Sequence, residues 1–172
     1  MTSALAMPEF RERFGEIADT SALVPLINVA FIAEQIAIDG DRINAEKLQS
    51  YFKTGRFLVV ENDQGLAGCV YVELRGVRGY IGLLALRPEL KGRGLGRKLM
   101  ASAEVYLANA GCEAADLRTI SARNDLLPMY KHLGYREIGT EQMPQEIRLK
   151  VPCHFIVMSK QLPKSGRMLE DS

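Results

Sequence analysis

Cysteine and histidine are scarce in this sequence, and neither is spaced to bind a metal. Cys69, Cys112 and Cys153 lie far apart, without the short spacings of metal-binding cysteines. We therefore expect buried, reduced thiols in a cytosolic protein. His132 and His154 form no HExxH pattern, so we expect no metal and no metalloenzyme chemistry.

Long apolar runs are also missing, and the first residues, MTSALAMPEF, show no charged region followed by a hydrophobic core. We expect no membrane partner, no signal peptide and a cytoplasmic location. A net charge of +1 argues against a surface built for nucleic acid, although it allows a local basic patch. The 172 residues, 47% hydrophobic and 25% charged, fit one globular domain. Leu162–Ser172 is expected to be a frayed tail, polar from about Pro163 onward.

The most informative stretch runs from Tyr80 to Met100, YIGLLALRPELKGRGLGRKLM. Its apolar first part, to Leu86, predicts a strand covered on both faces, and Pro88 ends it because proline has no N–H for a ladder. A basic, glycine-rich turn then leads into a helix. Helix N-terminal amides, a concave turn and four cationic side chains predict an anion site, usually for phosphate, made by Lys91, Gly92, Arg93, Gly94, Leu95, Gly96, Arg97 and Lys98.

This turn differs from two familiar nucleotide-binding loops. No Gly-Lys-Ser/Thr follows, as a Walker A loop requires, and the acidic residue that a Rossmann loop has about twenty positions on is missing. The alternative interpretation is a strand-to-helix turn with solvated arginines.

Apolar periodicity and turn residues predict helices first and strands afterwards, with two successive hairpins and a helical crossover that makes the Tyr80 and Ala115 strands parallel. One helical stripe is Leu23, Leu26, Ile27, Ala30, Phe31 and Glu34, and another is Leu95, Leu99, Ala103, Tyr106 and Ala110. The expected elements are an edge strand within Phe10–Ala18, a helix Ser21–Ile38 started by Asp19 or Thr20, a helix capped by Asn44, strands Arg56–Glu61, Leu66–Leu74, Tyr80–Leu86 and Ala115–Ser121, a short helix Leu126–His132, strands Tyr135–Gly139 and Cys153–Lys160, and a loop Thr140–Pro152.

Two motifs in this order resemble the GNAT N-acyltransferase superfamily. The strand Leu84-Ala85-Leu86-Arg87-Pro88 and the turn Lys91-Gly92-Arg93-Gly94-Leu95-Gly96 are similar to that family's Arg/Gln-x-x-Gly-x-Gly/Ala segment, with lysine at the first position. Tyr130-Lys131-His132-Leu133-Gly134-Tyr135 is similar to its Tyr-x-x-x-Gly-Phe/Tyr motif. The resemblance covers Ile17 to Lys160. It implies an α/β (α+β) fold whose mixed, mostly antiparallel sheet has a splayed parallel central strand pair flanked by helices.

The resemblance implies that the turn binds acetyl-CoA, the acetyl donor. Its pyrophosphate is expected on the backbone amides from Arg93 to Lys98, and its pantetheine along the exposed backbone of Leu84, Ala85 and Leu86. A backbone N–H near Leu86 would polarise the thioester carbonyl. The implied reaction is direct attack by a neutral primary amine, with loss of the CoA thiolate.

Two residues near the second motif are assigned by the same resemblance. Tyr130 would protonate the departing sulfur as general acid, since a phenol with a pKa near ~10 stays protonated at neutral pH. The alternative is a core aromatic on an amphipathic helix. Asn124 lies one position later than the asparagine that contacts pantetheine in relatives, so it either makes that contact or caps the helix.

The general base is less well defined by the sequence. Tyr80 occupies the place where many relatives carry a glutamate, and Glu73 on the neighbouring strand is the best remaining carboxylate, acting directly or through a water. The alternative for Glu73 is an ion pair with Arg75 or Arg78. Negative charge for the acceptor amine is expected from Glu34, Asp39, Asp41 and Glu141, which could equally form a solvated face.

Other functions and partners stay open at this level. A non-catalytic acyl-CoA-binding or regulatory module would keep the fold without the acceptor chemistry, and the missing glutamate favours it. Nucleic-acid binding is not expected, because four cationic residues in one turn suffice for a cofactor but are sparse for a duplex. Small amines, polyamines, aminoglycosides and protein or peptide amines all remain as acceptors, and assembly into a homodimer is left open.

Overall fold

The computed structural model describes residues 10–164, so the expectations about Met1–Glu9 and most of the C-terminal tail lie outside it. Its elements, with η for 3-10 helices, are β1 (Arg11–Phe14), η1 (Ile17–Asp19), α2 (Thr20–Ala30), η2 (Ile32–Ile36), α3 (Ala45–Thr54), β2 (Arg56–Asn62), β3 (Gly65–Arg75), β4 (Arg78–Leu86), η3 (Pro88–Leu90), α4 (Leu95–Asn109), β5 (Ala114–Ile120), η4 (Ser121–Leu126), α5 (Leu127–His132), β6 (Arg136–Gln142) and β7 (His154–Gln161).

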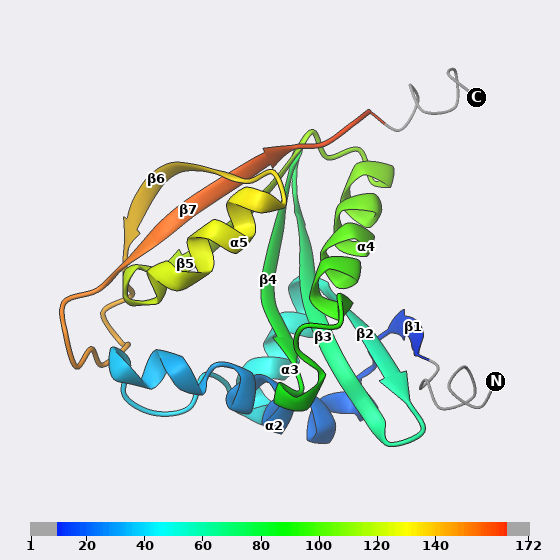
Figure 1. The fold of residues 1–172 in the computed structure, drawn as a ribbon, viewed down its shortest axis with the longest axis horizontal. Helices are drawn as coiled ribbons and strands as arrows, with labels where there is room; N and C mark the ends of the chain where they lie inside the picture. The colour runs from blue at the N-terminus through cyan, green and yellow to red at the C-terminus, as the bar shows by residue number, and fades with distance from the viewer. Residues whose placement is uncertain (1–9, 165–172) are drawn as a thin grey trace.

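The strands form one seven-stranded sheet in the order β1-β2-β3-β4-β5-β7-β6 (Figure 1). Only the β4–β5 pair is parallel, and the other five neighbouring pairs are antiparallel. The predicted meander through β2, β3 and β4 and the predicted parallel crossover to β5 are both confirmed.

Helices cover both faces of this sheet. On one face, α4 packs on β2, β3 and β4 through a core that includes Leu99, Leu107 and Ile81, and α5 borders the same core with Tyr130. On the other face, α2 and α3 cover a second core that includes Phe57 and Tyr71. The alternation of side chains along each strand supplies apolar groups to both cores.

The parallel pair is short and then splays apart. Its register contains three pairs, Arg78 with Ala114, Gly79 with Ala115 and Tyr80 with Asp116. Further along β4, Leu83 has a positive φ of 51° at a bulge opposite β3, which changes the face to which the following side chains point. The splayed central pair that the resemblance implied is therefore confirmed.

A segment between β6 and β7 bridges the open end of the splay. The Asp39 N–H donates to the Arg148 carbonyl (2.9 Å), and the Lys150 N–H donates to the Ala37 carbonyl (2.7 Å). Beneath them, Ala37, Ile120 and Phe155 form a small third core. The first helical region is thereby tied to the β5–β7 half of the sheet.

Several boundaries differ from the sequence expectations. The predicted first strand is only β1, and the predicted helix to Ile38 ends at Ala30 and continues as η2. Asp19 does not cap α2, because its carboxylate accepts hydrogen bonds from Arg13 and from the Glu16 N–H instead. In contrast, Asn44 caps α3 as predicted, accepting from the Lys47 N–H at 2.8 Å.

Other differences concern strand coverage and the C-terminal half. The predicted loop Thr140–Pro152 begins as strand, since β6 extends to Gln142. Leu162, which was assigned to a frayed segment, is buried against the first core. Along β4, buried residues alternate with half-buried ones, so its coverage on both faces is incomplete where the strands splay.

Gly79 and Leu107 should prove energetically coupled. A Cβ at Gly79 would lie 2.6 Å from both δ-carbons of Leu107, so Gly79→Ala should lower the free energy of unfolding by about 1–3 kcal/mol through overpacking. In a Leu107→Ala background the same alanine should cost much less, because the truncated side chain leaves room.

Denaturant unfolding of the two single variants and the double variant measures this coupling. Gly139→Ala is the matched control, since an added Cβ there meets nothing within 4 Å. Equal costs of Gly79→Ala in both backgrounds would contradict the expectation.

Candidate active site

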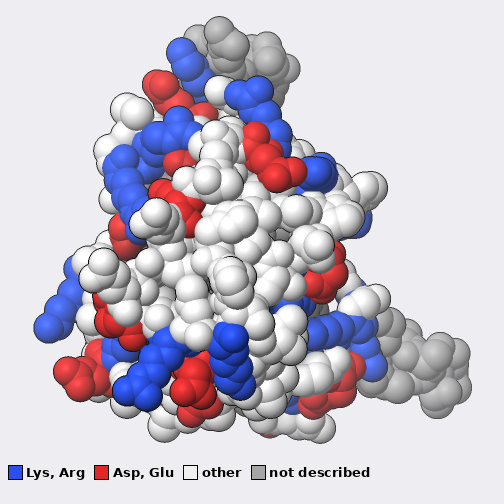
Figure 2. All heavy atoms as spheres, turned by 90° about the vertical axis from the view of Figure 1, so that its left-hand side faces the viewer, with Lys and Arg blue, Asp and Glu red and all other residues white. Residues whose placement is uncertain are grey.

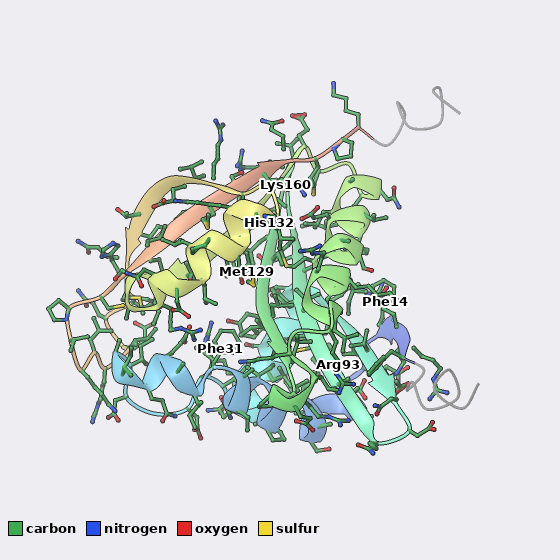
Figure 3. All side chains as sticks on the ribbon, in the orientation of Figure 1. Phe14, Phe31, Arg93, Met129, His132 and Lys160 are labelled. Carbon is green, nitrogen blue, oxygen red and sulfur yellow. The ribbon has the colours of Figure 1, made fainter. Side chains whose placement is uncertain are left out.

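A cleft of about 400 Å³ opens where β4 and β5 part. Its walls come from elements far apart in the sequence: Tyr80 from β4, Thr119 from β5, Tyr130 from α5 and Glu34 from η2. Figure 3 shows Phe31 on the helical side of this region and Met129 on α5 across from it.

The glycine-rich turn leads directly into α4. Gly92 and Gly94 have φ values of 81° and 83°, a conformation that disfavours side chains, and Gly94 is the N-cap residue of α4. The first amides of the helix have no intrahelical acceptors and face out of its N-terminus. Arg93 lies on this turn, below α4 in Figure 3. The turn has the free amides that an anion site needs.

The four cationic side chains at this turn, those of Lys91, Arg93, Arg97 and Lys98, are exposed. Within residues 10–164 none of them forms an ion pair. They do not all point the same way, because Lys98 lines a separate shallow groove beside Phe14. The remaining members of the turn, Leu95 and Gly96, supply backbone, with Leu95 buried in the core.

The backbone of Leu84, Ala85 and Leu86 has one free edge. On one side Ala85 and Leu86 pair with Cys69 and Gly68 of β3. On the other side the pairing with β5 has already ended at Tyr80. Their remaining backbone groups therefore face the splay, where a ligand with amide groups can pair with them.

Tyr130 lies at the cleft with an unshared hydroxyl. Its ring meets that of Tyr135 edge-on at 6.2 Å, and its hydroxyl forms no hydrogen bond within the described residues. Burial raises the pKa of Tyr130 to about 12, with smaller upward contributions from Tyr80 and Glu34 and a downward one from Arg123. The phenol stays protonated near neutral pH and can donate a proton.

Glu73 lies outside the cleft. It accepts a hydrogen bond from the Tyr71 hydroxyl at 2.6 Å and forms an ion pair with Arg75. Burial acts to raise the pKa of Glu73, but the hydrogen bonds from Tyr71 and Arg75 outweigh it and lower the pKa. The ion pair with Arg75 is the alternative that the sequence had offered. As a general base, Glu73 remains a prediction without a place in the cleft.

Two further expectations are only partly met. Asn124 is exposed and caps no helix, because α5 starts after Leu126 without a side-chain cap, so its pantetheine contact stays a prediction. Among the acidic residues expected near the acceptor, Glu34, Asp39 and Asp41 line the cleft. Glu141 does not, and pairs with Arg118 at 3.3 Å.

Tyr80 is held flat along β4. A Cβ at Gly82 would lie 2.8 Å from Cε2 and 3.1 Å from the hydroxyl of Tyr80, so the ring covers Gly82. The Arg75 guanidinium lies 4.1 Å from the centre of the same ring. The phenol thus lies over the strand just where β4 leaves β5.

Glu34 is the one buried charged residue among residues 10–164, with 8% of its surface exposed. It pairs with Arg42 at 3.7 Å and forms no hydrogen bond to another side chain of the described residues. Burial raises the pKa of Glu34, and the charges of Arg42 and Arg123 oppose this only in part.

The sequence model of the acetyltransferase (GNAT) domain family matches residues 30–151. The chain belongs to the GNAT acetyltransferase family. The match spans the cleft, the glycine-rich turn and Tyr130.

Individual proteins resemble this GNAT chain in sequence or in fold. A mycothiol acetyltransferase of Propionibacterium freudenreichii subsp. shermanii is 26% identical over 130 residues, 72% of this chain, but the matched part is only 42% of that protein. The ribosomal-protein-S18-alanine N-acetyltransferase of Escherichia coli gives a TM-score of 0.71 at 16% identity, covering 92% of this chain and 97% of that one. The spermidine N-acetyltransferase of Vibrio cholerae, solved with CoA and spermine, gives 0.69 at 18% identity, covering 90% and 96%.

In this GNAT chain, the residue that sequence reasoning undervalued is Glu34. It was included among acidic residues near the acceptor but not weighed as a base. The signal was its spacing, because it continues the apolar stripe of Ile27 and Phe31 and so predicts a carboxylate turned inward.

The two carboxylates should shift the stability of this GNAT protein with pH in opposite senses. The pKa of Glu34 is raised from 4.5, so the native state binds more protons than the unfolded state, and stability from this group falls as pH rises from that value. Compared with wild type, Glu34→Gln should therefore gain relative stability as pH rises.

Glu73→Gln is the matched control, with the opposite sign. The pKa of Glu73 is lowered from 4.5, so its contribution is present above that value and is lost as pH falls through the native pKa. Urea unfolding from pH 3 to 8 checks both variants. A wild-type-to-Glu34→Gln difference that stays flat across this range would contradict the shift.

Proposed function

We propose that this protein transfers an acetyl group from acetyl-CoA to a primary amine by direct attack. The observation that carries the proposal is the meeting of three features at one edge of β4: an anion-ready turn, an unpaired strand backbone, and a cleft that holds both a carboxylate and a phenol. Family membership supports the same chemistry.

The residues present fit acetyl-CoA. The free amides at the start of α4 and the unpaired cations of the turn suit a pyrophosphate. The free edge of β4 at Leu84 to Leu86 suits the amides of pantetheine. A further sign is the Thr119 hydroxyl, which is buried at the cleft and has no hydrogen-bond partner among the described residues. A buried hydroxyl without a partner costs free energy, so a ligand group that bonds it is favoured.

When bound, acetyl-CoA supplies an activated acetyl thioester. The chain's own contributions are then orientation and proton transfer. The free backbone edge at Leu86 offers an N–H to a carbonyl oxygen that gains negative charge. The Tyr130 hydroxyl donates a proton to the departing sulfur. No metal is part of the proposal, and residues 10–164 contain no cluster of three metal-binding side chains.

The acceptor is proposed to carry an anionic group beside its amine. Side chains of both signs line the cleft in equal number, the carboxylates being those of Glu34, Asp39, Asp41 and Glu146 and the cations those of Arg42, Lys47, Arg118 and Arg148. Figure 2 likewise shows both signs around a largely uncharged centre on the face with β6 and β7. A polyamine favours a net negative pocket, so amino acids and short peptides match this balance better.

A second candidate is a non-catalytic acyl-CoA-binding module. It is favoured by one observation, that Tyr80 stands where many relatives carry a glutamate and Glu73 lies outside the cleft. A cytoplasmic location, a homodimer and a single domain over the whole chain stay predictions. No helix within residues 10–164 is long and apolar enough to cross a membrane.

A thiol-release assay with acetyl-CoA and an amine panel separates the two candidates. We expect turnover with amino acids or short peptides and weaker turnover with spermidine, because the lining is balanced in charge. Arg93→Ala and Arg97→Ala should raise KM for acetyl-CoA, with Lys53→Ala, an exposed lysine on α3, as control. Tight acetyl-CoA binding without turnover of any amine would favour the module.

Tyr130→Phe should lower kcat by about 10²-fold or more, the usual range for a lost general acid, with little change in KM for acetyl-CoA. The ring and its contact with Tyr135 are kept, so stability should change little. Tyr106→Phe, on α4 away from the cleft, controls for loss of a hydroxyl. Unchanged turnover across the pH range would remove Tyr130 from the mechanism.

A further inference from the structure

The buried carboxylate of Glu34 has few polar partners for its negative charge. A buried carboxylate is costly unless it is paired and hydrogen-bonded. Its one ion pair, to Arg42, is long at 3.7 Å, and no side chain of the described residues hydrogen-bonds it. Nevertheless it faces a cleft large enough for a small molecule. An ammonium group in the cleft would supply the missing partner.

The groups around Glu34 leave it the one carboxylate suited to take a proton. Arg42 and Arg123 contribute positive charge, and the guanidinium of Arg123 is held by Asp125 at 3.0 and 3.1 Å. Tyr80 and Tyr130 face the same cleft with their phenol side chains. The other charged groups that line it are Asp39, Asp41, Glu146, Lys47, Arg118 and Arg148. Of these carboxylates only Glu34 is buried.

Glu34 and Tyr130 reach the cleft from different elements. Glu34 is carried by η2, on the helical side, and Tyr130 by α5, which packs beside the β5–β7 half. The free edge of β4 lines the same cleft through Leu84. Acyl transfer to an amine needs a base at the nitrogen that forms the new bond and an acid at the sulfur that leaves.

We propose that Glu34 binds the ammonium of the acceptor and is the general base that deprotonates it. This inference rests on the proposed function. The sequence left the general base unassigned, because Tyr80 stands at the position where a glutamate was expected. The inference gives that role to Glu34 on η2, because Glu73 is engaged by Tyr71 and Arg75 outside the cleft.

The proposed reaction conserves protons and bonding electrons. Glu34 takes one proton from the ammonium, which leaves a neutral amine whose lone pair forms the C–N bond to the acetyl carbon. The C–S bond breaks, and its electron pair stays on sulfur. Tyr130 gives its proton to that sulfur and regains one from the nitrogen. The proton held by Glu34 is later released to solvent, so an amide and a thiol are the products.

The test compares kcat/KM with pH for wild type, Glu34→Gln and Glu46→Gln, using the best amine of the panel. Glu46 is an exposed carboxylate in the first turn of α3 and does not line the cleft. At pH 7 we expect Glu34→Gln to lose about 10²-fold or more and Glu46→Gln to change little. The loss should shrink as pH approaches the pKa of the amine, about 8 for the α-amine of a short peptide, because solution then supplies the neutral nucleophile. Glu34→Asp should retain part of the rate and the wild-type shape of the profile.

The outcomes separate this inference from the proposed function. If wild type turns over no amine, the proposed function itself fails. If wild type is active and Glu34→Gln keeps its rate and pH profile, only the inference is overturned. A loss of kcat/KM that is equal at every pH also overturns it. So does a loss that comes with weaker acetyl-CoA binding or with partial unfolding of the variant under the assay conditions, because either pattern indicates a structural role for Glu34.

Discussion

The structure depends on the early end of the β4–β5 pairing. Three residue pairs hold the two strands together, after which β5 continues to pair with β7 along its whole length while β4 keeps only β3. Backbone groups that lose a partner inside a protein must find another. The free edge of β4 is thus open to a partner, and Thr119, Tyr130 and Glu34 line the cleft beside it.

Polar and apolar contacts hold the two halves of the sheet together at both ends of the splay. At the closed end, Arg78 donates to Asp116 at 2.6 and 2.7 Å and to the Ser159 hydroxyl at 2.9 Å, which joins β4, β5 and β7. At the open end, the hydrogen bonds of Asp39 and Lys150 and the small core at Ile120 connect the helical region to the other half. The cleft is therefore part of the fold, and the residues across it are held in fixed relation.

The sequence predicted the parts that depend on local signals. Alternating apolar residues and turn sequences indicated the meander, and Asn44 indicated its helix, because these signals act over a few residues. The early end of α2 could not be predicted from local signals, because the chain just after η2, at Ala37 and Asp39, is held by hydrogen bonds to residues more than a hundred positions away. The helical stripe indicated that Glu34 turns inward, but not that it lies on a separate 3-10 helix that lines the cleft. Strand alternation puts Glu73 and Tyr71 on the same side of β3, but it could not show that Tyr71 and Arg75 both engage the Glu73 carboxylate.

The pKa values of Glu34 and Glu73 are shifted in opposite directions because their surroundings differ. Hydrogen bonds from Tyr71 and Arg75 stabilise the anion of Glu73 and lower its pKa, which weakens it as a base. Burial raises the pKa of Glu34 and strengthens it as a base toward an ammonium. A glutamate at position 80 would add a further negative charge to the cleft that Glu34 already lines, and neighbouring like charges raise the cost of ionising both. Tyr80 in place of the expected glutamate is consistent with a cleft whose base comes from η2.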